Sequence, residues 1–174
     1  MSRPAAVRRL VVAAASRHGS TREIADRIAT TLAVELPVPW SVVREDLTDL
    51  RVLDDADVVV LGSAIYYGHW MRQGARALEF LRDTVPLRLW LFSSGPISEE
   101  ETENAQVISA DAMADLGEAD GHMVFGGNLR TADLGVVERI VARALHVLPG
   151  DHRDWSQVDA WAEHIAEELR SRVA

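Results

Sequence analysis

The stretch Val7–Thr21, with the sequence VRRLVVAAASRHGST, decides the fold of this chain of 174 residues. Its mostly apolar first part predicts a buried β-strand over Val7–Ala15. Apolar side chains then recur at helical spacing from Ser20 and stop before Pro37, which predicts a helix. A single glycine, Gly19, lies in the short turn between them, so the stretch is a strand, a tight turn and a helix.

The rest of the chain repeats this alternation, which is typical of a parallel sheet joined by crossover helices. Further strands are predicted at Trp40–Arg44, Val58–Gly62, Leu87–Phe92 and His122–Phe125. Further helices are predicted at about His69–Arg82, Asn104–Leu116, Leu134–Val147 and Trp155–Arg170. We find no repeat and no linker, so the sequence predicts a single α/β domain over residues 1–174.

The composition excludes several classes of function. The chain has 27 acidic and 18 basic residues, and its net charge of -9 argues against binding to nucleic acid and against stable membrane association. It has no cysteine, so any redox chemistry needs a bound cofactor. No spacing of histidines completes a metal site, and no apolar run is long enough for a membrane helix. We therefore expect a cytoplasmic protein without a metal.

The turn between the first strand and the first helix has the properties of a phosphate site. Gly19 permits a close approach of the backbone, neighbouring hydroxyls are donors, and the helix N-terminus favours an anion. The lone glycine excludes both the dinucleotide fingerprint and the P-loop. An alternative is that Ser20 or Thr21 only caps the helix, with Glu23 in its first turn. The candidate phosphate ligands are Ser16, Arg17, His18, Gly19, Ser20 and Thr21.

The pattern Ser-x-x-Gly-Ser-Thr after a strand resembles the phosphate loop of flavodoxins, [ST]-x-[ST]-G-x-[ST]. His18 stands where that family has Ser or Thr, and the His-Gly-Ser-Thr version is similar to a lineage of flavodoxin-domain proteins and menaquinone-dependent protoporphyrinogen oxidases. The C-terminal pair Asp154-Trp155 before a helix also resembles the oxidases. The resemblance implies a flavodoxin-like three-layer fold, a five-stranded parallel sheet of order 2-1-3-4-5, and FMN as cofactor.

Two later stretches, Val58–Gly68 and Trp90–Pro96, extend the resemblance, and both end strands at the ligand edge of the sheet. A flavin needs flat apolar walls and backbone groups for its polar edge. One aromatic of this region is predicted to stack on the ring, with ordinary packing as the alternative. The candidate ring contacts are Ser63, Ala64, Ile65, Tyr66, Tyr67, Gly68, Ser93, Ser94, Gly95 and Pro96, and Trp70 belongs to the same aromatic cluster.

The resemblance implies an FMN-dependent oxidoreductase that acts on a quinone or on protoporphyrinogen. An electron carrier with a separate redox partner and a cofactor-free interaction domain stay open as alternatives, as does a homodimer. The acidic run Glu99–Glu103 lies where the oxidases have a more basic insertion, which argues against protoporphyrinogen and membranes. No catalytic residue is assigned, although His18, Tyr66, Tyr67 or His69 would assist proton transfer if they lie beside the ring.

Overall fold

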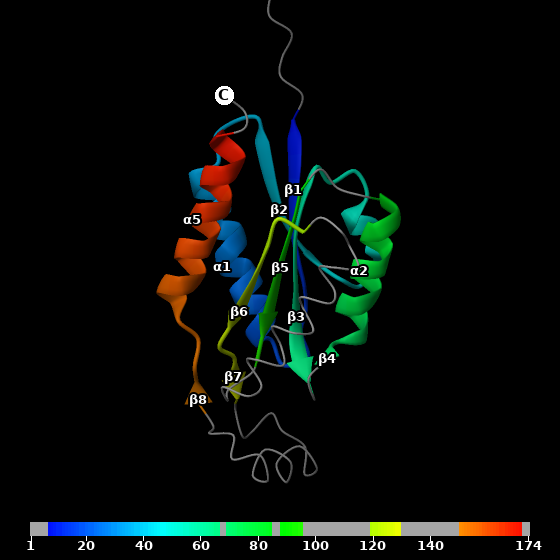
Figure 1. The fold of residues 1–174 in the computed structure, drawn as a ribbon, viewed down its shortest axis with the longest axis vertical. Helices are drawn as coiled ribbons and strands as arrows, with labels where there is room; N and C mark the ends of the chain where they lie inside the picture. Colours follow the sequence, from blue (N-terminus) through cyan, green and yellow to red (C-terminus); the bar gives the residue numbers. More distant parts are fainter. Residues whose placement is uncertain (1–6, 67–68, 85–87, 96–118, 130–149, 172–174) are drawn as a thin grey trace, which may run out of the picture.

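The computed structural model describes residues 7–66, 69–84, 88–95, 119–129 and 150–171. Five parallel strands form its main sheet, in the order β2-β1-β3-β5-β6 (Figure 1). Their bounds are β1 Arg8–Ala15, β2 Trp40–Asp46, β3 Val58–Tyr66, β5 Arg88–Ser94 and β6 Gly121–Phe125. With the short strand β4 (His69–Trp70) set aside, this is the predicted order 2-1-3-4-5, so the predicted topology is confirmed.

Helices cover both faces of this sheet. The helices α1 (Ser20–Glu35) and α5 (Trp155–Ser171) pack side by side on one face, and α2 (Arg72–Thr84) lies on the other (Figure 1). A short 3-10 helix, η1 (Leu50–Leu53), packs beside α2. The predicted three-layer α/β fold is therefore confirmed. In the part of the chain that the structure describes, no helix is long and apolar enough to cross a membrane.

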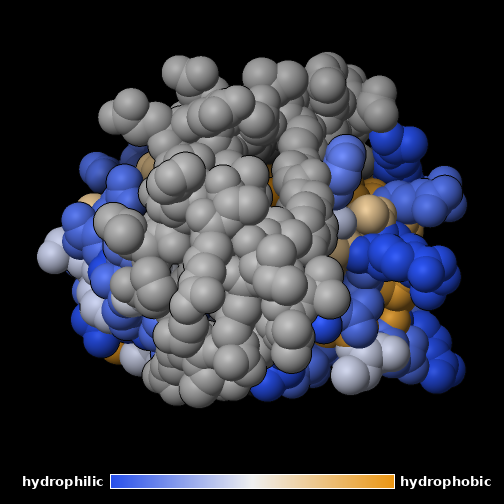
Figure 2. All heavy atoms as spheres, turned by 90° about the horizontal axis from the view of Figure 1, so that it is seen from below, coloured by the Kyte–Doolittle hydropathy of each residue, from blue (hydrophilic) through white to orange (hydrophobic). Residues whose placement is uncertain are grey.

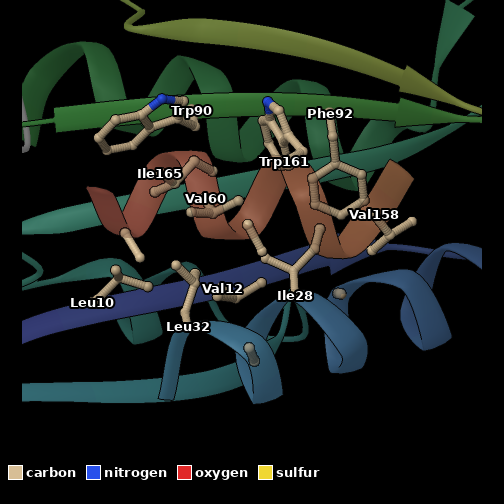
Figure 3. Close-up of a cluster of buried hydrophobic side chains, with 14 of the residues drawn as sticks. Leu10, Val12, Ile28, Leu32, Val60, Trp90, Phe92, Val158, Trp161 and Ile165 are labelled. Carbon is tan, nitrogen blue, oxygen red and sulfur yellow. The ribbon is translucent and has the colours of Figure 1, made fainter. Parts of the chain in front are cut away.

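The central strand β1 explains why the layers form. Its successive side chains point to opposite faces of the sheet, so Leu10 and Val12 enter the core under α1 and α5, while Val11 and Ala13 enter the core under α2. All four are fully buried. Figure 3 shows the first core, in which side chains of β1, α1, β3, β5 and α5 meet between the sheet and the two helices.

The structure differs from the predicted elements mainly at strand ends. Strand β3 continues past Gly62 to Tyr66, and β4 pairs back on it in antiparallel register, Tyr66 opposite His69. The helix predicted from about His69 therefore begins only at Arg72. A second small sheet pairs β7 (Asn128–Leu129) with β8 (Gly150–Asp151) and was not predicted, because two-residue strands have no readable periodicity. The helices predicted at residues 104–116 and 134–147 lie outside the described residues.

Candidate functional site

The ends of three strands meet at one edge of the sheet. Residue Ala15 of β1 is the register partner of Ser63 of β3, which in turn is the partner of Ser93 of β5. The carboxyl ends of these three strands are therefore neighbours at the lower end of Figure 1. Seen from this end, the described surface residues around the region drawn in grey are mainly hydrophilic (Figure 2). Ligands of open α/β sheets bind at this edge.

Gly19 shapes the turn between β1 and α1. Its φ of 91° lies in the left-handed region, and its carbonyl accepts the first helical hydrogen bond from the amide of Glu23 at 2.9 Å. The Gly19 amide donates to the hydroxyl of Ser16 at 3.0 Å. Within the described residues no side chain caps α1, so the alternative in which Ser20 or Thr21 caps the helix is wrong. The amides of the first helical turn are left without intrahelical partners.

The donor set at this turn fits a phosphate. A Cβ built on Gly19 would meet nothing within 4 Å, so the backbone borders open space there. The hydroxyls of Ser16 and Ser20 each accept a main-chain N–H, the latter from Asn128 at 3.0 Å, which leaves their own protons to donate. These donors and the positive end of the α1 dipole are what a phosphate requires.

The remaining residues of the turn lie differently from one another. The Thr21 side chain is buried, and its hydroxyl is 2.7 Å from that of Ser94. Thr21 therefore supports the turn from its buried side. Because its hydroxyl is bonded to Ser94, this position does not favour the predicted contact of Thr21 with the phosphate. Arg17 and His18 are exposed, and the His18 ring meets the ring of Tyr66 edge to face, with centroids 6.4 Å apart.

The end of β3 is held by its own hairpin. The Ser63 hydroxyl is buried, donates to the carbonyl of Ala64 and accepts the amide of Met71, both at 3.0 Å. Ala64 is also buried, whereas Ile65 and Tyr66 are half-buried at the edge. Of the predicted ring contacts on this segment, Ile65 and Tyr66 therefore have accessible surface. Tyr67 and Gly68 lie outside the described residues.

From the sequence we expected the two serines at the end of β5 to contact the ring. In the structure both hydroxyls are already hydrogen-bonded within the protein. Consecutive strand residues point to opposite faces, so Ser94 bonds Thr21 under α1 while Ser93 accepts the indole N–H of Trp70 at 2.8 Å. Both serines are buried. Gly95 follows with a φ of 123° and donates its amide to the carbonyl of Phe125 at 3.3 Å. Pro96 lies outside the described residues.

The half-buried His122 of β6 joins Ser93 and Trp70 in a polar group that the sequence did not indicate. Its Nε2 is 3.0 Å from the Ser93 hydroxyl, which already accepts a proton from Trp70. Burial lowers the pKa of His122 to about 4, so the ring that pairs with the Ser93 hydroxyl is neutral at pH 7. The bond to Ser93 also fixes the Trp70 indole on the α2 side of the sheet. Only the tertiary pairing of β5 with β6 brings these side chains together.

The burial of His122 predicts a loss of stability at mildly acidic pH. Between pH 6.5, the ordinary pKa of histidine, and about 4, the unfolded chain binds a proton that the folded chain does not. The free energy of unfolding should therefore fall as pH drops through this range, by about 1 kcal/mol per pH unit from this residue. Urea unfolding at pH 7 and pH 5 measures the loss.

A His122→Gln variant is the control, because glutamine keeps a hydrogen-bonding group and does not titrate. Its free energy of unfolding should change less between pH 7 and pH 5 than that of the unmodified chain. Asp46, Asp49 and Asp159, whose pKa values are lowered by hydrogen bonds from arginine side chains, titrate below pH 3.8 and do not interfere. Equal pH dependence in the two proteins would contradict the assignment to His122.

Solved structures show the same fold. A flavodoxin from the domain Archaea has a TM-score of 0.60 at 16% identity, over 93% of this chain and 99% of its own. A flavodoxin from Streptococcus pneumonia TIGR4 has a TM-score of 0.58 at 19% identity, over 94% and 99%. The rubredoxin oxygen:oxidoreductase from Desulfovibrio gigas has a TM-score of 0.64 at 17% identity, and the match covers 95% of this chain but 37% of that protein.

Sequence comparison identifies the family. None of the curated proteins matches this chain. The flavodoxin domain family matches residues 11–156, which include most of β1, the Gly19 turn and the start of α5. The chain therefore belongs to the flavodoxin domain family, and this membership implies FMN as its cofactor.

Proposed function

We propose that this chain holds FMN at the carboxyl edge of its sheet and transfers electrons between the flavin and a soluble partner. The observation that carries the proposal is Gly19, left-handed at the start of an uncapped helix and bordered by open space. The ends of β3 and β5 adjoin this turn, at the place where the ring would lie. When bound, the flavin supplies the electron-transfer chemistry.

Main-chain and hydroxyl groups are the expected donors to the cofactor. For the phosphate these are the first-turn amides of α1 and the hydroxyls of Ser16 and Ser20. For the ring, the hydroxyls of Ser93 and Ser94 and the amide of Gly95 are already bonded, so the other backbone groups near Ile65 and Gly95 are the remaining candidates. These two residues are close, because a Cβ on Gly95 would lie 3.4 Å from the carbonyl oxygen of Ile65.

Aromatic groups at the edge are candidates for stacking and for proton transfer. The rings of His18 and Tyr66 meet there, and His69 lies opposite Tyr66 in the β3–β4 hairpin. Both histidines are exposed. Trp70 is a weaker candidate for stacking, because its indole N–H is bonded to Ser93. No side chain is assigned as catalytic on these contacts.

Binding of FMN in preference to riboflavin is the expected result that tests this proposal. Each charge-assisted hydrogen bond to the phosphate contributes about 1.5 to 3 kcal/mol, so two such bonds give a preference of roughly a hundredfold or more. Titration of the purified protein by flavin fluorescence measures both dissociation constants. A colourless protein with equal affinity for the two flavins would leave only the cofactor-free alternative.

For the partner, we propose a small soluble acceptor, such as a quinone, or a redox protein in the cytoplasm. The net charge of -9 supports this, because a protein that works on anionic membranes gains about 1 kcal/mol from each well-placed basic residue. Turnover with menadione and with protoporphyrinogen separates the classes. Fast menadione reduction favours a quinone reductase. If the protein shows neither activity, the result favours an electron carrier. Fast protoporphyrinogen oxidation together with liposome binding would overturn the proposal.

Analytical ultracentrifugation decides whether a homodimer forms.

A further inference from the structure

The small sheet formed by β7 and β8 docks on the first turn of α1. Asn128 of β7 is the register partner of Asp151 of β8, and the amide of Asn128 donates to the hydroxyl of Ser20 at 3.0 Å. The amide of His152, next to β8, donates to the carbonyl of Gly127 at 3.0 Å. A pair of strands distant in the sequence thus contacts the helix end proposed to hold the phosphate.

Arg153 makes the second contact between this small sheet and α1. Its guanidinium donates to Glu23 of α1 at 2.6 Å and, in bidentate fashion, to Asp151 at 2.6 and 2.8 Å. The guanidinium carbon lies 4.6 Å from the ring centroid of Trp155. The side chain of Arg153 is only 5% exposed, against 53% for Glu23. A buried guanidinium with several hydrogen-bond partners is held in one geometry, unlike an ion pair on the exposed surface.

The two contacts lie on one face of α1. Ser20 and Glu23 are three residues apart, so their side chains are neighbours on the first turn. The Glu23 carboxylate suits a helix N-terminus that has no ligand, but it repels a phosphate dianion placed at the same end. Arg153 pairs with both Glu23 and Asp151, so its single positive charge offsets part of this repulsion, while the main-chain amide of Asn128 bonds to the Ser20 hydroxyl.

We infer that Arg153 is a positioning residue for the FMN phosphate: it holds the Glu23 carboxylate, offsets part of its charge, and fixes the β7–β8 sheet against the start of α1. This inference rests on the proposed function. It assigns a role to a residue more than 130 positions from the phosphate turn, on a segment that sequence analysis did not connect with the cofactor. Its effect should be confined to the phosphate, because Arg153 pairs with Glu23 and Asp151 and lies over the Trp155 ring, and none of these three residues belongs to the ends of β3 and β5.

The chain contains a matched control. Arg27 of α1 forms a comparable bidentate bond, to Asp159 of α5 at 2.7 and 2.6 Å. Unlike the side chain of Arg153, that of Arg27 is 51% exposed, and it lies one helical turn beyond Glu23. An Arg27→Gln variant removes this ion pair between α1 and α5, just as Arg153→Gln removes the ion pair between the β7–β8 sheet and α1. Because it is farther from the helix N-terminus, it should leave flavin binding unchanged.

The experiment compares dissociation constants for FMN and riboflavin in the full chain and four variants. Arg153→Gln should weaken FMN about fivefold and riboflavin less than twofold. Adding Glu23→Gln to that variant should restore part of the FMN affinity, because the carboxylate that lies on the first turn of α1 is then gone, while Asp151 keeps its charge. Glu23→Gln alone, an exposed substitution that does not threaten folding, should raise the ratio of FMN to riboflavin affinity about twofold to threefold.

The outcomes separate this inference from the proposed function. If the unmodified chain does not prefer FMN to riboflavin, the proposed function fails and the inference fails with it. If the unmodified chain prefers FMN but Glu23→Gln leaves the ratio unchanged, only the inference is overturned. The inference alone is likewise overturned if Arg153→Gln weakens the binding of FMN and riboflavin equally. It is also overturned if Arg27→Gln weakens FMN binding as much as Arg153→Gln does.

Discussion

A Gly19→Val variant is expected to fold and to bind FMN at least about a hundredfold more weakly than the unmodified chain. The φ of 91° at Gly19 is strongly disfavoured for a β-branched residue, so valine costs about 1 to 3 kcal/mol in backbone strain or forces the turn to change. In the present conformation the side chain would also occupy the open space beside the backbone. Both effects act on the phosphate site, and fluorescence titration with FMN measures the sum.

Two smaller substitutions show which effect dominates. Gly19→Asn tolerates the left-handed conformation, so it tests the filling of the space with little strain. Gly19→Ala adds one methyl group and should give an intermediate loss of FMN affinity. Circular dichroism and a thermal melt establish that each variant is folded. A folded Gly19→Val protein with unchanged FMN affinity would remove the phosphate assignment of this turn.

A Gly62→Ala variant should lose about 2 to 4 kcal/mol of folding free energy. Gly62 of β3 lies opposite Phe92 of β5, and a Cβ on this glycine would overlap the Phe92 ring. The ring cannot move aside easily, because it is fully buried against Phe125 and Trp161, with centroids 6.0 and 6.1 Å away. Urea unfolding at pH 7 measures the change.

Another strand glycine provides the control for this variant. A Cβ on Gly121 of β6 would lie 3.3 Å from the nearest atom of the Trp90 ring, a tight contact that a small shift relieves. Gly121→Ala should therefore cost well under half as much as Gly62→Ala. Adding Phe92→Leu to Gly62→Ala should recover part of the lost stability. Equal costs at the two glycines would show that the Phe92 ring moves aside in the Gly62→Ala protein.

The sequence predicted the fold because its local signals agree with the tertiary structure. The apolar run of β1, the glycine turn and the periodic pattern of α1 each have an independent physical reading, and all three are found. Strand β3 reads as buried on both faces because Val58–Leu61 are all apolar, and all are buried. The helix start at Arg72 was missed because His69 and Trp70 pair with the end of β3, and the two-residue strand that they form has no readable periodicity.

The site was predictable at the level of segments and much less at the level of side chains. The ends of β1, β3 and β5 lie together as expected, since neighbouring parallel strands end at one edge. Whether a hydroxyl faces a ligand or the interior depends on pairing partners, and Thr21 and Ser94 satisfy each other across 73 residues. Arg153 reaches Glu23 across 130 residues, and no local pattern marks such a contact.

The adjacent serines at the end of β5 have a consequence for how binding would spread through the protein. Ser94 connects this strand end to α1, and Ser93 connects it to the β4 hairpin on the opposite face. The helix α1 and the β4 hairpin are thus joined at one dipeptide, so neither opens locally without straining the bonds of the other. A ligand that contacts only the α1 side should therefore slow amide hydrogen exchange in the hairpin on the far side of the sheet as well.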